Sequence, residues 1–133
     1  MHKLVLAITC LLLTLATPIH PQSAPTPSPL GIWRGTLDSV PSVTLTLADD
    51  TGTLDGTIVF YAVNGGTKRT MSIEPHTLIH PALDGNALTF QVKRLDATLI
   101  TVKVLFATPT KAQLHCLDCG DDAPIADLTK DTL

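Results

Sequence analysis

A regular alternation of apolar and polar residues, broken by short turn clusters, constrains this chain more than any other feature. The clearest example is the run at 42–47, in which Val43, Leu45 and Leu47 alternate with Ser and Thr residues. A strand with one face on a core and the other in water has this period of two. Because the same pattern returns at 86–94 and 99–107, the sequence predicts an all-β fold.

Turn clusters rich in Gly, Asn and Asp separate these runs. Counting the runs gives about eight strands, at 31–38, 42–48, 53–63, 69–79, 86–94, 99–107, 111–116 and 124–130. Connections this short leave no room for crossover helices, so neighbouring strands should be antiparallel. We predict a small antiparallel up-and-down β-barrel of about eight strands, because closure removes exposed sheet edges. A β-sandwich is the alternative.

The N-terminal region has the pattern of a secretory signal peptide. A basic start is followed by an apolar run at 4–16 and then by a stretch rich in Pro and Ser. As a helix, that run would rise about 20 Å, which is too short for a hydrocarbon layer of about 30 Å. We therefore expect a signal peptide at 1–24, cleaved after Ala16 or Ala24, a Pro-rich linker at 25–30 and a β-barrel domain at 31–133. The mature chain should be secreted or periplasmic, with no integral membrane span.

The charge distribution argues against nucleic acid as a partner. The chain has a formal net charge of −3 and no clustered stripe of Lys and Arg. Binding to a phosphate backbone depends on such a basic surface.

The opening Gly31-Ile32-Trp33 has the G-x-W form and resembles the first strand of the calycin group, the lipocalin-type and avidin-type barrels. It also resembles small β-barrel domains of secreted bacterial proteins. The resemblance implies that Trp33 is a barrel-end anchor, plugging the closed end. In that group an arginine near the last strand covers the tryptophan; here Lys130 is the cation at that end.

Cys116 and Cys119 are the two cysteines that would remain after removal of Cys10 with the signal peptide. In an oxidising compartment the two thiols should form a disulfide. Redox use is one alternative, although the neighbouring acidic residues would not lower a thiol pKa. Zinc binding with His115 is another, although a closed zinc site takes four ligands.

Candidate catalytic groups are sparse. Glu74, His76 and His80 share a face of one predicted strand, but the two histidines would stand about 13 Å apart along a straight strand. The sequence contains neither a G-x-S-x-G nucleophile motif nor a phosphate-binding loop before a helix. We expect no enzymatic activity, no cofactor and no metal site.

The side chains expected inside the barrel form an apolar set without an ionisable group. If the barrel encloses a cavity, that cavity should suit a small apolar ligand; the other outcome is a fully packed core. The candidate ligand-binding residues are Leu45, Phe60, Phe90, Val102 and Val104.

Two functions follow from these expectations. The first is an exported, non-catalytic β-barrel binding module for a small apolar ligand. The alternative is a protein-binding accessory or inhibitor module that acts on an exported hydrolase. The run at 58–63 is apolar on both faces, and a neighbouring loop is the default cover for its second face. Under the alternative function, Tyr61 and its apolar neighbours would form an interface instead.

Overall fold

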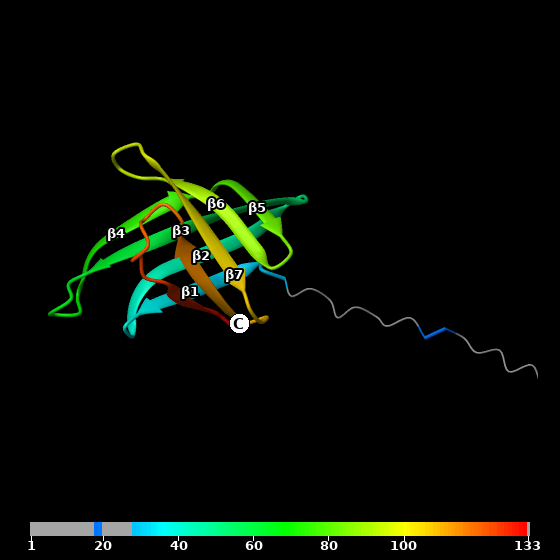
Figure 1. Ribbon diagram of the computed structural model, residues 1–133, viewed down its shortest axis with the longest axis horizontal. Helices are drawn as coiled ribbons and strands as arrows, with labels where there is room; N and C mark the ends of the chain where they lie inside the picture. The colour runs from blue at the N-terminus through cyan, green and yellow to red at the C-terminus, as the bar shows by residue number, and fades with distance from the viewer. Residues whose placement is uncertain (1–17, 20–27, 133) are drawn as a thin grey trace, which may run out of the picture.

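The computed structural model describes residues 18–19 and 28–132 (Figure 1). Residues 1–17 and 20–24 of the predicted signal peptide and residues 25–27 of the predicted linker lie outside the described residues. The described part contains antiparallel strands and no helix, so no helix there could cross a membrane. The strands are β1 (Gly31–Leu37), β2 (Val40–Asp50), β3 (Thr53–Val63), β4 (Thr70–Thr77), β5 (Ile79–Asp84), β6 (Ala87–Lys93), β7 (Leu99–Phe106), β8 (Lys111–Cys116) and β9 (Ala126–Lys130).

The strands form one sheet that curls into a nearly closed barrel (Figure 1). Their order is β4-β3-β2-β1-β9-β8-β7-β6-β5, so the first and last strands of the sheet are neighbours in the chain. β4 pairs with β3, whereas β5 pairs with β6. The two therefore act as one bent strand that brings the ends of the sheet together. The predicted all-β, up-and-down barrel is confirmed.

The described residues form one strand more than the sequence predicts. The additional strand arises at Leu78, which separates β4 from β5. Its N–H donates a hydrogen bond to the Gly56 carbonyl at 3.1 Å, and its side chain is buried. Glycine is needed opposite this bend, because a Cβ at Gly56 would collide with the Thr46 carbonyl oxygen and crowd the Leu78 side chain. The predicted run at 69–79 therefore ends early, and a further strand begins at Ile79.

One apolar core fills the middle of the barrel. The alternating strands direct one set of side chains inward. The buried residues are Trp33, Val43, Leu45, Leu47, Ile58, Leu78, Leu88, Phe90, Val92, Val102, Val104, Ala112, Leu114, Ala126 and Leu128.

One end of the barrel is closed around Trp33, which is 1% exposed. Its ring centroid lies 5.0 Å from that of Phe106, and its indole N–H donates to the Pro29 carbonyl at 2.8 Å. The Lys130 ammonium lies 5.6 Å from the Trp33 ring centroid, within cation–π range, and donates to the Ser28 carbonyl at 3.0 Å. Lys130 thus stands where the calycin resemblance implies an arginine, and residues 28–29 of the predicted linker contact the barrel.

Candidate functional site

The end of the barrel opposite Trp33 is hollow. Four connections surround it, those between β1 and β2, β3 and β4, β6 and β7, and β8 and β9. Two adjoining cavities of about 290 and 270 Å³ open there, and both are lined by Phe60, Leu114, Cys116 and Cys119. We call these two cavities together the mouth.

The walls of the mouth are mainly apolar. Phe60 lies opposite Val43 in the pairing of β3 with β2, and Leu114 lies opposite Val104 in the pairing of β8 with β7. The remaining apolar lining consists of Val92, Ile100 and Val102 in the larger cavity, and of Leu37, Val43, Tyr61, Ala123, Pro124 and Ala126 in the smaller one. The aromatic side chains are divided between the two ends: Trp33 and Phe106 are in contact at the closed end, and Phe60 and Tyr61 line the mouth.

Strand β4 brings polar side chains into the mouth. Its apolar residues Met71 and Ile73 face outward and are 70% and 62% exposed. Glu74 and His76 lie opposite the inward-facing Phe60 and Ile58, and both line the larger cavity. The expectation of an interior without ionisable groups is therefore wrong at this end. The pairing of β4 with β3 decides which face points inward, whatever the polarity of the side chains.

His76 is held within the mouth by its neighbours. Its side chain is 13% exposed, and its ring centroid lies 5.7 Å from that of Phe60. The nearest approach of its Nε2 to the Glu74 carboxylate is 4.0 Å, which is longer than a hydrogen bond. A small polar group bound between these two side chains could contact both.

The β6–β7 turn places Arg94 at the rim of the larger cavity. The Arg94 N–H donates to the Thr98 carbonyl at 2.8 Å, which closes the turn. The Asp96 carboxylate accepts hydrogen bonds from the Thr98 hydroxyl at 2.6 Å and from its N–H at 3.0 Å. The bond from the Thr98 hydroxyl is the main cause that lowers the pKa of Asp96 below its ordinary value. The ionised carboxylate therefore orders the turn that carries Arg94.

The two cysteines lie where β8 ends: Cys116 is its last residue, and Cys119 follows in the β8–β9 connection. Their sulfur atoms lie within disulfide-bonding distance, and their Cα atoms are 5.5 Å apart. The Asp118 carboxylate accepts a hydrogen bond from the Thr101 N–H at 2.6 Å, and the Leu117 N–H donates to the Thr101 carbonyl at 2.9 Å. The turn is thereby fixed against β7 as part of the wall.

The candidate ligand-binding residues fall into two groups. Phe60 and Val102 line the mouth. Leu45, Phe90 and Val104 are at most 1% exposed and belong to the packed core, away from both cavities. The barrel thus has a packed core in one half and cavities in the other. The sequence left a packed core and a ligand cavity as alternatives, and the structure contains both.

His80 does not join Glu74 and His76. It lies on β5 beyond the bend and is exposed. Among residues 18–19 and 28–132, no group of three or more His, Cys, Asp or Glu side chains is arranged to hold a metal ion.

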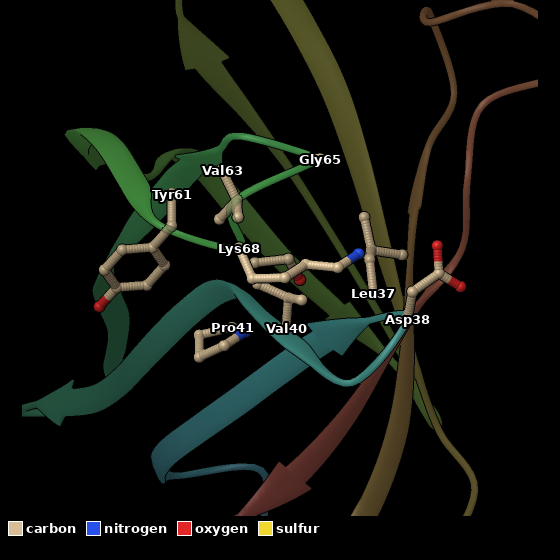
Figure 2. A pocket seen from close by; sticks show the side chains of 9 residues that line it. Leu37, Asp38, Val40, Pro41, Tyr61, Val63, Gly65 and Lys68 are labelled. Atoms are coloured by element: carbon tan, nitrogen blue, oxygen red, sulfur yellow. The ribbon is translucent and has the colours of Figure 1, made fainter.

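A third hollow, of about 230 Å³, continues from the mouth onto the outside of the barrel; we call it the outer groove (Figure 2). It lies between the β1–β2 and β3–β4 turns and shares Leu37, Ser42 and Tyr61 with the mouth. The Lys68 side chain reaches across it toward Leu37 and Asp38 (Figure 2). The Tyr61 hydroxyl is hydrogen-bonded to the Thr44 hydroxyl at 3.1 Å.

Comparisons with protein families, with curated proteins and with solved structures give no match for this chain. The resemblance of its opening strand to the calycin group therefore remains a prediction from the sequence.

Proposed function

We propose that this chain is an exported, non-catalytic binding module that takes a small, largely apolar ligand into the mouth of its barrel. The observation that carries the proposal is the pair of adjoining cavities of about 290 and 270 Å³ with mainly apolar walls. Ligand pockets in proteins begin at about 300 Å³ and combine such walls with a few polar groups. The predicted signal peptide is the basis for proposing export.

The test is binding of the neutral fluorophore N-phenyl-1-naphthylamine, whose emission rises in an apolar site. We expect saturable binding to the wild-type barrel and its loss in Ala123→Trp, because the indole would fill the smaller cavity. Ala48→Trp is the matched control, since Ala48 is exposed on β2. The absence of saturable binding, or equal binding by both variants, would contradict the proposal.

A protein-binding accessory or inhibitor module remains the second candidate. It is supported by the outward face of β4, where Met71 and Ile73 are largely exposed, with Tyr61 opposite Ile73 on β3. Residues of this kind are typical of interfaces. Immobilised wild-type protein should then retain a specific exported hydrolase that Ile73→Ser fails to retain. Retention of the same hydrolase by both would argue against this surface.

A further inference from the structure

The charged side chains of the mouth lie on one side only. The larger cavity is lined by Glu74, His76 and Arg94 in addition to its apolar wall. Among the residues that the structure describes, no charged side chain and no histidine lines the smaller cavity. A ligand that fills both cavities would therefore meet charged groups and a histidine at one end. Along the rest of its length it would meet mainly apolar groups, with the Ser42 and Tyr61 hydroxyls as the polar exceptions.

Resting on the proposed function, we infer that the mouth selects an amphipathic ligand whose polar head is uncharged and can both donate and accept hydrogen bonds. The head lies against Glu74, His76 and Arg94, which we call the polar cluster. The apolar body lies over Phe60, Leu114 and the cysteine pair, the residues common to both cavities.

The charges of the polar cluster set the charge of the head. The Glu74 carboxylate and the Arg94 guanidinium have opposite formal charges and border the same cavity. A head with a single charge would be attracted by one of these two groups and repelled by the other, so the opposing interactions would not offset the cost of removing the charge from water. An uncharged head that offers one donor and one acceptor avoids this cost.

His76 fixes the depth at which the head is held. Its ring is oriented by Phe60 and mostly buried, so it is placed before a ligand arrives. Its Nε2 makes no direct hydrogen bond with the Glu74 carboxylate at 4.0 Å. A ligand hydroxyl between them can donate to the carboxylate and interact with the imidazole, so both groups gain a partner.

The inference can be tested with three probes that share one ten-carbon chain: 1-decanol, decanoate and decylammonium, each below its aggregation concentration. Isothermal titration at neutral pH should give the lowest dissociation constant for decanol, by about tenfold relative to either ion, which corresponds to about 1.4 kcal/mol. Equal affinities, or a preference for either ion, would overturn the inference.

Two charge variants sharpen the test, because they should change the preference in opposite directions. Glu74→Gln removes the anion and should favour decanoate, whereas Arg94→Gln should favour decylammonium. His76→Phe keeps an aromatic ring against Phe60 but removes the nitrogen atoms, and it should weaken decanol binding about fivefold. His80→Phe, at an exposed position, is the matched control.

Naphthylamine binding separates failure of this inference from failure of the proposed function. If the fluorophore binds in the mouth but the probes and variants show no head preference, the inference fails and the binding module stands. If neither the fluorophore nor any probe binds, both fail. A circular dichroism spectrum and melting temperature equal to those of the wild type show that each variant is folded.

Discussion

The two ends of this barrel are built from the same strands but differ in packing. At the closed end, Trp33 and Phe106 fill the space, and Lys130 with residues 28–29 covers it. At the mouth, the side chains leave two cavities between them, and Glu74 and His76 face inward. An alternating sequence thus produces a filled end or an open end according to how the side chains of that end pack and which face of β4 points inward.

This division should separate the residues that stabilise the fold from those of the proposed binding site. Close-packed rings and a buried indole make many dispersion contacts, whereas side chains around a cavity lack partners on one side. The closed end should therefore hold the barrel together, and changes at the mouth should be tolerated by the fold.

The largest expected effect is at the closed end. Trp33→Ala should lower the free energy of unfolding by about 3–5 kcal/mol, because it removes the largest buried side chain and leaves a cavity. Phe60→Ala should cost less than half as much, since Phe60 already borders a cavity. Urea unfolding followed by far-ultraviolet circular dichroism measures both changes. Equal losses of unfolding free energy in the two variants would contradict the proposed difference between the closed end and the mouth.

An intermediate effect is expected from the cysteine pair at the mouth. Replacing both Cys116 and Cys119 with Ser should lower the free energy of unfolding by about 2 kcal/mol, because a loop this short restrains the unfolded chain only modestly. The fluorescence maximum of Trp33 in the folded variant should match that of the wild type. A thiol reductant should destabilise the wild type but leave the double variant unchanged. A shift in the Trp33 maximum would show that the two ends are coupled.

The smallest effect concerns the turn that carries Arg94. Thr98→Val removes the hydroxyl that donates to Asp96, so the pKa of Asp96 should rise toward its ordinary value, as measured by an NMR titration of the side chain. A lowered pKa in the folded state stabilises the fold above the ordinary pKa, and this contribution is lost as the pH falls through the lowered value. Thr98→Val should therefore weaken this acid dependence. Thr110→Val, in the β7–β8 turn of the closed end, should leave the pKa of Asp96 unchanged.

The sequence predicts the closed end of the barrel better than it predicts the mouth. Trp33 is the only tryptophan in the chain and lies in an alternating strand, and Lys130 is the cation of the last strand. Glu74 and His76 share one face of the predicted strand, but nothing in the sequence indicates that this face is the interior. Met71 and Ile73 alternate with polar residues like any core-facing set, so polarity alone would direct the wrong face inward. The sequence around Leu78 does not predict the bend, because the bend depends on the absence of a side chain at Gly56, which lies on another strand.

The sequence by itself determined the all-β class, the strand-and-turn rhythm and the residues that can form a core, because alternation and turn chemistry act over a few neighbouring positions. Tertiary structure decided where the barrel closes, which end is filled and which face of β4 lines the mouth. Those outcomes depend on register between strands, and a change of one residue in register reverses every side chain of a strand. The place of Glu74 and His76 in the polar cluster therefore depends on the pairing of β4 with β3.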